Sequence, residues 1–156
     1  MRKVIHTDKA PRAIGSYSQA VEAGDTLYLA GQIPLDPETM TLVEGDTLQQ
    51  VAQIFENIKN VLEAANSDLN EVVKLVVYLV DLSDVGAVNE GIARYFTEPF
   101  PARTTIQVAA LPKGARVEID AIAKNPIINH PLSRMELTAV QRWLARIFSC
   151  IKRWKF

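Results

Sequence analysis

The clearest hydrophobic pattern in this chain begins after residue 46 and predicts an amphipathic helix. Asp46 is the expected N-cap, and Gln49, three residues later, completes the signature of a capping box. A second helix is expected to start at a cap formed by Ser83 or Asp84 and to end near Phe96. In both helices the apolar positions recur every three or four residues and therefore share one face. They are Leu48, Val51, Phe55, Ile58, Leu62 and Ala65 in the first helix, and Val85, Val88, Ile92 and Phe96 in the second.

Strand patterns surround these two helices. A short strand is expected at Lys3–His6, followed by strands at Tyr17–Ala23 and Thr26–Ala30. Gly24-Asp25 between the last two is a hairpin signal. The segment Val72–Val80 is almost entirely apolar and β-branched, which predicts a strand buried on both faces.

The last two predicted strands, Ala102–Leu111 and Arg116–Ala123, lie on either side of a break at Pro112-Lys113-Gly114. Each carries a charged residue among apolar and small neighbours, Arg103 on the first and Glu118 on the second. Such a charge costs free energy unless it is paired or faces a cleft. Two interpretations stay open: a structural ion pair, or an Arg that binds a carboxylate opposite a Glu that handles a water or a proton.

The order of elements is three strands, a helix, a strand, a helix and two strands, which predicts an α+β fold with a mixed sheet covered by two helices. With 156 residues, 48% of them hydrophobic, the chain is long enough for one domain with a substantial core. The single cysteine, Cys150, excludes an intramolecular disulfide, and His6 and His130 lie near no ligand set, so no metal site is expected. Because no signal-peptide pattern and no run of ~20 apolar residues is found, a cytoplasmic location is expected.

Charge divides the chain into two parts. Residues 1–123 hold 10 Lys and Arg against 17 Asp and Glu, a net charge of −7, whereas residues 124–156 hold 7 against one, a net charge of +6. The acidic part gives no electrostatic reason to expect a nucleic-acid partner. The basic part is interpreted as a linker, 124–134, followed by a helical tail, 135–156.

Apolar residues of the tail recur at spacings of three and four and predict an amphipathic helix; they are Leu137, Val140, Leu144, Ile147, Ile151 and Trp154. Three partners are compatible with this pattern: an anionic membrane surface, the groove of a partner protein, or a bacterial microcompartment shell that recruits enzymes through terminal peptides. A helix packed on the rest of its own protein and an extension without a selected role also stay open. The favoured interpretation is a tethered targeting helix.

Several short motifs occur in an informative order. They are Gly15-Ser16-Tyr17-Ser18-Gln19-Ala20, Ala30-Gly31-Gln32-Ile33-Pro34, Val88-Asn89, Pro101-Ala102-Arg103, and Leu111-Pro112 followed by Val117-Glu118-Ile119. Each motif is weak alone, but the set is specific. Through it, residues 1–123 resemble the reactive-intermediate deaminases, the RidA- or YjgF-like proteins. The resemblance implies a chorismate-mutase-like fold and a homotrimer with ligand clefts between subunits.

The resemblance also implies a chemistry, the hydrolysis of 2-imino acids such as 2-iminobutanoate and 2-iminopropanoate to 2-keto acids and ammonia, without a cofactor. Arg103 is then expected to hold the substrate carboxylate through two parallel hydrogen bonds, and Glu118 to orient the attacking water and shuttle its proton. Tyr17 is expected to close the cleft, Asn89 to hydrogen-bond at the pocket wall, and Thr105 to contribute its backbone carbonyl.

Ala30 and Gly31 complete the substrate-binding set that the resemblance implies, although Gly31 also fits a bulge or a close backbone approach. The family often has Ser at the position of Ala30 and Cys at that of Thr105, and usually Pro at that of Ser16. These departures affect the expected substrate preference and rate. The alternative function is a non-catalytic trimer that binds small carboxylates or acts as a chaperone.

Overall fold

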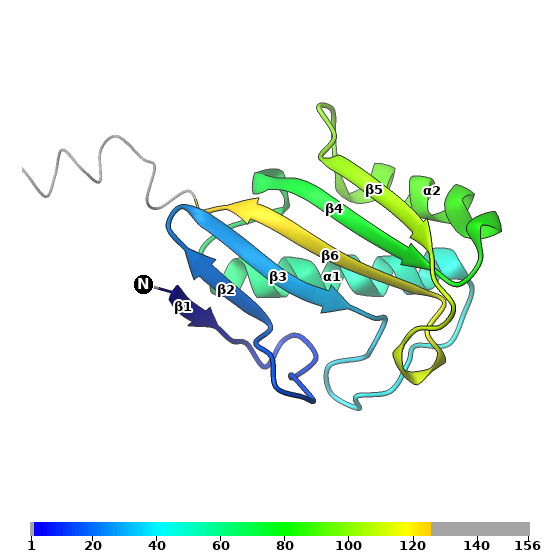
Figure 1. Ribbon diagram of the computed structural model, residues 1–156, viewed down its shortest axis with the longest axis horizontal. Helices are drawn as coiled ribbons and strands as arrows, with labels where there is room; N and C mark the ends of the chain where they lie inside the picture. The colour runs from blue at the N-terminus through cyan, green and yellow to red at the C-terminus, as the bar shows by residue number, and fades with distance from the viewer. Residues whose placement is uncertain (1, 126–156) are drawn as a thin grey trace, which may run out of the picture. The chain divides into compact units, whose positions relative to one another are not determined.

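The computed structural model describes residues 2–125, and the predicted linker and tail therefore lie outside the described residues apart from Lys124 and Asn125. The described chain forms the predicted α+β fold, with the helices and strands in the expected order (Figure 1). The strands are β1 Arg2–Ile5, β2 Ala20–Ala23, β3 Thr26–Gln32, β4 Val72–Leu79, β5 Ala102–Gln107 and β6 Val117–Lys124. The α-helices are α1 Thr47–Ala64 and α2 Val85–Tyr95, and short 3₁₀ turns occupy η1 Leu69–Glu71, η2 Leu82–Asp84 and η3 Pro112–Gly114.

One six-stranded sheet has the order β1-β2-β3-β6-β4-β5. β4 and β5 are parallel and every other pair is antiparallel. β4 therefore lies between β5 and β6, so the two strands around the Pro112-Lys113-Gly114 turn are not hydrogen-bonded neighbours. The turn instead carries the chain across the end of β4.

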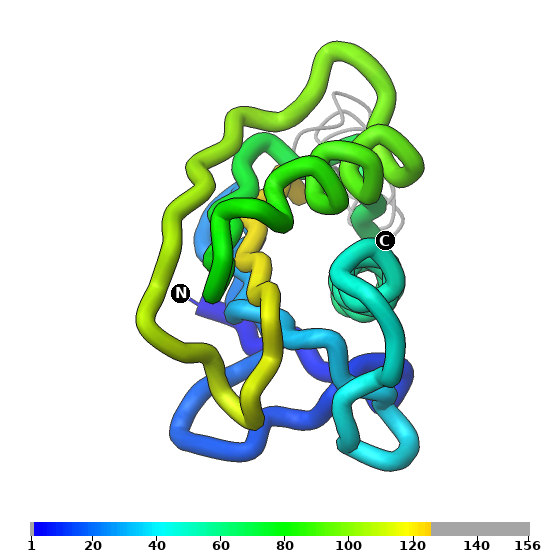
Figure 2. Tube along the Cα trace, turned by 90° about the vertical axis from the view of Figure 1, so that its right-hand side faces the viewer, coloured from blue at the N-terminus to red at the C-terminus, as the bar shows by residue number. Residues whose placement is uncertain are grey.

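Both helices cover the same face of the sheet (Figure 2). α1 begins as predicted: the Asp46 carboxylate accepts a hydrogen bond from the Gln49 amide at 2.9 Å, and the Gln49 side chain accepts one from the Asp46 amide. Asp84 occupies the N-cap position of α2, but its carboxylate accepts hydrogen bonds from Arg116 and not from the helix amides. Asp84 is therefore the N-cap residue as predicted, but its side chain does not cap the helix amides.

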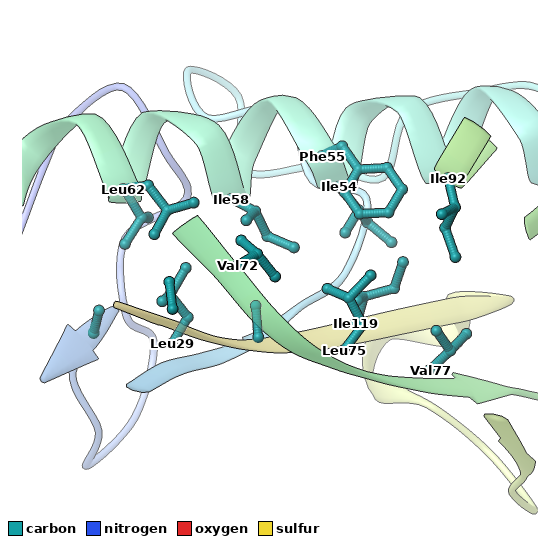
Figure 3. Close-up of a cluster of buried hydrophobic side chains, with 14 of the residues drawn as sticks. Leu29, Ile54, Phe55, Ile58, Leu62, Val72, Leu75, Val77, Ile92 and Ile119 are labelled. Carbon is teal, nitrogen blue, oxygen red and sulfur yellow. The ribbon is translucent and has the colours of Figure 1, made fainter. Parts of the chain in front are cut away.

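The core lies between α1 and the sheet. Figure 3 shows Ile54, Phe55, Ile58 and Leu62 of α1 directed toward strand residues that include Leu75 and Ile119. All of these side chains are fully buried. Phe55 also contacts Phe96 edge to face, with ring centroids 5.3 Å apart. The predicted face of α1 is therefore the one that packs.

Three strand predictions need correction. Within a single chain β4 is buried on one face only: Val77 and Leu79 are buried, whereas Val76 and Tyr78 are partly exposed, because both helices lie on the same side. Tyr17 lies in a bend before β2, which begins at Ala20. β5 ends at Gln107 and does not reach Leu111, since the chain turns toward η3.

Candidate active site

Arg103 lies on the edge strand β5 and points to the helix-covered face. It is in register with Leu75 of β4, which is buried beneath the helices. Residues in register on neighbouring strands project from the same face of a sheet. Consistent with this, Arg103 Nη1 donates a hydrogen bond of 2.7 Å to Asn89 Oδ1 on α2.

Arg103 and Asn89 line a cavity of about 480 Å³ whose remaining walls are mostly apolar. Phe100, which is 48% exposed, contributes to the rim. Arg103 is exposed, and within residues 2–125 its guanidinium forms no salt bridge. A guanidinium without an acidic partner in this range, beside an apolar wall, suits a small carboxylate with a short hydrocarbon chain.

Glu118 projects from the opposite face of the sheet. It is in register with Tyr78 of β4, whose neighbours Val77 and Leu79 are buried under the helices. Since successive strand residues point to opposite faces, Glu118 and Tyr78 both lie on the face that the helices leave open. Burial raises the pKa of the Glu118 carboxyl, and the charge of Asp120 raises it further. Glu118 therefore takes up a proton at a higher pH than an exposed Glu.

Glu118 borders a second cavity, of about 310 Å³, together with three of the predicted site residues, Tyr17, Ala30 and Gly31. Tyr17 is 50% exposed, and its hydroxyl accepts a hydrogen bond from the Ile14 amide at 3.4 Å. Seven further residues line this cavity and were not predicted as site residues, although Gln32, Ile33 and Pro112 stand in the quoted motifs. They are Pro11, Arg12, Ile14, Gln32, Ile33, Leu35 and Pro112.

Gly31 is needed here for a close approach. The pairing of β3 with β6 is irregular between Leu29 and Gln32, which places Gly31 in a bulge against β6. A Cβ built on Gly31 would lie 2.9 Å from Cδ of Glu118 and 3.2 Å from its Cγ, and would overlap the carboxylate. The absence of a side chain at Gly31 thus gives the Glu118 carboxylate its position in the cavity.

Gly31→Ala should displace this carboxylate without unfolding the protein. The obstructed atoms are at the end of a flexible side chain, which can rotate away at small cost. We expect a loss of activity of about tenfold or more, since a displaced catalytic group loses its productive geometry, with the melting temperature lowered by only a few degrees. A variant that keeps full activity would show that the position of Glu118 is not critical. Gly86→Ala is a suitable control, because a Cβ at Gly86 would contact nothing within 4 Å.

Thr105 lies on the same strand face as Arg103, two residues further along β5, as predicted. It lines neither of the two cavities. Its hydroxyl oxygen is buried without a hydrogen-bond partner in the described part of the chain. A polar atom in this condition is available to a ligand or a neighbouring chain.

Within one chain, then, the predicted site residues form two separate groups. Asn89 and Arg103 line the cavity on the helix-covered side, whereas Tyr17, Ala30, Gly31 and Glu118 line the other. The expectation that Glu118 faces Arg103 across the turn is wrong for a single chain, because β4 separates the two strands and the side chains project from opposite faces.

Two residues beside Glu118 were missed by the sequence analysis. The Tyr78 hydroxyl donates a hydrogen bond of 3.0 Å to Oδ2 of Asp120, which lies two residues after Glu118 on β6. Burial raises the pKa of Tyr78, and its hydrogen bond to Asp120 and the charges of Asp120 and Glu118 add to the effect. The period-two pattern places Glu118 and Asp120 on one face, but the Tyr78 contact depends on strand register.

Residues 2–125 contain no cluster of three or more His, Cys, Asp or Glu that could hold a metal ion. In the same range, no helix has the length and apolarity that a membrane span requires.

The sequence is similar to many known proteins. The sequence model of the family described as Endoribonuclease L-PSP matches residues 7–125. Protein DfrA of Myxococcus xanthus is 55% identical over 124 residues, which cover 78% of this chain and 95% of the relative. A mouse protein named 2-iminobutanoate/2-iminopropanoate deaminase is 51% identical over 123 residues, 79% of this chain and 91% of its own.

Solved structures with similar sequences also share the fold of this chain. RidA from the Antarctic bacterium Psychrobacter sp. PAMC 21119 superposes with a TM-score of 0.76 at 54% identity and covers 78% of this chain and 98% of that one. The E. coli protein TdcF, solved with bound serine, has a TM-score of 0.74 at 38% identity, over 78% of this chain and 98% of its own. With a family match over residues 7–125 and relatives about half identical along nearly their whole length, the chain belongs to the RidA/YjgF family.

Proposed function

We propose that this protein is a 2-imino acid deaminase, which hydrolyses substrates such as 2-iminobutanoate and 2-iminopropanoate to 2-keto acids and ammonia. The single observation that carries the proposal is the pair of cavities: one offers the Arg103 guanidinium for a carboxylate, and the other offers the partly buried Glu118 carboxylate with a raised pKa. Mammalian relatives about 50% identical to this chain bear the name of this activity.

The two cavities form one site only if a second copy of the chain joins them, so the proposal includes an oligomer, and we propose a homotrimer. The open face of the sheet supports this, because Tyr28, Val73 and Ile106 are between 42% and 50% exposed there or at its margin. Large exposed apolar patches mark interaction surfaces in soluble proteins. In the trimer, Arg103 and Asn89 of one subunit would meet Glu118 and Tyr17 of its neighbour.

Sedimentation velocity tests the oligomer directly. Because three copies would bury the apolar residues of the open face, we expect a trimer at micromolar concentration with no detectable monomer. A stable monomer under these conditions would contradict the proposal, and it would also leave each active site incomplete.

In the proposed reaction Arg103 binds the substrate carboxylate bidentately and fixes the position of the adjacent C2 carbon. Asn89 holds the guanidinium through its 2.7 Å hydrogen bond. The substrate reacts as its protonated iminium form: water attacks C2, Glu118 accepts one proton from the water, and the C=N π electrons pass to the nitrogen, which becomes the neutral amine of a carbinolamine. When the C–N bond breaks, Glu118 returns its proton to the departing nitrogen, a lone pair of the hydroxyl oxygen forms the C=O bond, and the hydroxyl proton passes to solvent. The products are a 2-keto acid and ammonia, and Glu118 ends in its starting state.

The direct test is a coupled assay. A PLP-dependent dehydratase generates 2-iminobutanoate from threonine or 2-iminopropanoate from serine in the presence of semicarbazide, which captures imine that has not been hydrolysed. The protein should accelerate keto-acid formation and reduce semicarbazone formation. Equal product ratios with and without the protein would refute the deaminase proposal.

A second candidate is a non-catalytic protein that binds small carboxylates. Two observations favour it: Ala30 brings no hydroxyl to the cavity of Glu118, and the related TdcF was solved with bound serine. Binding of 2-ketobutanoate without any effect in the coupled assay would support this function. Two solved relatives bear the name putative endoribonuclease, but the net charge of −7 over residues 1–123 does not favour binding to a phosphate backbone.

A further inference from the structure

We propose that Tyr78 and Asp120 are positioning residues for Glu118: Tyr78 fixes the Asp120 carboxylate next to Glu118, and the fixed negative charge makes Glu118 a stronger proton acceptor. The inference rests on the proposed function, in which Glu118 moves the proton, and it adds two residues that do not touch the substrate. It also predicts a property of Glu118 that is measurable without any substrate.

Three side chains on two neighbouring strands form this arrangement. Glu118 and Asp120 are separated by one residue of β6 and therefore project from the same face. Tyr78 of β4 is in register with Glu118, and its hydroxyl reaches diagonally to Oδ2 of Asp120 at 3.0 Å. The 3.0 Å hydrogen bond holds Asp120 on the side of Glu118, since a carboxylate so bonded is not free to turn to solvent.

The electrostatic consequence follows from the burial of this face. All three side chains are partly buried, so their charges are less screened than on an open surface. The pKa of Glu118 is raised first by burial and then by Asp120. Repulsion from a second carboxylate favours the protonated form of the first. Asp120 thus strengthens Glu118 as a base.

Other charged or titratable groups near Glu118 are few and do not replace Asp120. Arg12 and Tyr17 line the same cavity from the preceding loop. Arg116, two residues before Glu118, uses its guanidinium on Asp84, at 3.0 Å. Lys113 of η3 donates to the Met40 carbonyl at 2.9 Å. On β3, Gly31 next to Glu118 carries no charge. Within residues 2–125, Asp120 is the acidic neighbour that raises the pKa of Glu118.

The two neighbouring carboxylates, Glu118 and Asp120, suit both steps of the proposed reaction. As the bond between water and C2 forms, Glu118 takes one proton, and a more basic carboxylate takes it more readily. The resulting neutral Glu118 relieves the repulsion from Asp120. As the C–N bond breaks, the same proton passes to the nitrogen, ammonia leaves, and the hydroxyl proton passes to solvent as the C=O bond forms. No proton moves to Asp120 or Tyr78 at any step.

The test compares Asp120→Asn and Tyr78→Phe with the wild type in the full-length protein. The first readout is the titration of the Glu118 side-chain carboxyl by ¹³C NMR, which needs no activity. Asp120→Asn should lower the pKa of Glu118 by about half a unit or more, since a neighbouring unit charge is removed. Tyr78→Phe should lower it by a smaller amount. In the Asp120→Asn background, Tyr78→Phe should add nothing, because Tyr78 acts through Asp120.

The second readout is the pH dependence of kcat/KM. Its acid limb should move to lower pH by the same amount as the NMR titration in each variant. Asp120→Glu, which keeps the charge, should shift neither readout strongly. Tyr28→Phe is the matched control, since Tyr28 is a 50% exposed tyrosine of the neighbouring β3.

An unchanged Glu118 titration in Asp120→Asn would overturn the inference, whatever the enzyme assay shows. A shifted titration in a protein without deaminase activity would instead overturn the proposed function and leave the electrostatic role of Asp120 intact. A shifted titration with an unshifted acid limb would show that Glu118 is not the base of the reaction, and the positioning role would then be overturned.

Discussion

Replacing Arg103 by alanine should abolish imine hydrolysis in the coupled assay while leaving the protein folded. The substrate is a small imino acid whose carboxylate is its main binding handle. Loss of a hydrogen bond to a charged group costs about 1.5–3 kcal/mol, which corresponds to a loss of roughly 10- to 150-fold in binding or more for a bidentate contact. Stability should change little, because Arg103 is exposed and, among the described residues, its side chain forms a hydrogen bond only to Asn89.

Two further variants test whether the guanidinium of Arg103 specifically binds the substrate carboxylate. Arg103→Lys should recover little activity, since an ammonium group is a point charge without the planar fork of a guanidinium. Arg94→Ala is the matched control, because Arg94 is an exposed arginine of the adjacent α2 that pairs with Glu90 and lines neither cavity. Wild-type rates in Arg103→Ala would show that another group holds the carboxylate.

The sequence predicted the helices better than the sheet, and the reason is the range of the interactions that define each. The Asp46–Gln49 capping box and the apolar face of α1 are set by residues three or four positions apart. Tyr17 was assigned to a strand because it precedes an alternating segment, but its hydroxyl bonds the Ile14 amide within a loop. The local sequence pattern does not distinguish the first residue of a strand from a loop residue that precedes the strand.

The candidate site also shows that local sequence patterns do not predict contacts between distant parts of the chain. Motifs in the chain identified Arg103, Glu118 and Gly31, and the structure places all three at cavities. Their arrangement could not be predicted, because period-two alternation fixes which residues of one strand share a face but not the order of strands. β4 lies between β5 and β6, and the registers Arg103 with Leu75 and Glu118 with Tyr78 put the two side chains on opposite faces. The Tyr78–Asp120 contact, which joins residues 42 apart, depends on the same register.

Replacing Glu118 by glutamine should lower turnover by about 10²- to 10⁴-fold, the usual contribution of a general base, and change KM only a few-fold. Glutamine keeps the shape of the side chain and can orient water, but it accepts no proton at neutral pH. Glu22→Gln is the matched control: Glu22 is a partly buried strand glutamate whose contact is a salt bridge to Lys3 at 3.6 Å. Its replacement should leave turnover unchanged.

The pH dependence of Glu118→Gln distinguishes a catalytic from a structural role. In the wild type, turnover should fall on the acid side as Glu118 is protonated, at a pH above the ordinary glutamate range near 4.3 because its pKa is raised. The variant should lack this limb. Since the folded pKa exceeds the unfolded one, the stability that Glu118 contributes at low pH is lost as pH rises through the folded value. Glutamine avoids this loss, so at neutral pH the melting temperature of the variant should equal or exceed that of the wild type. Unchanged turnover together with a lowered melting temperature would instead make Glu118 a structural residue, and the attacking water would then require a different activating group.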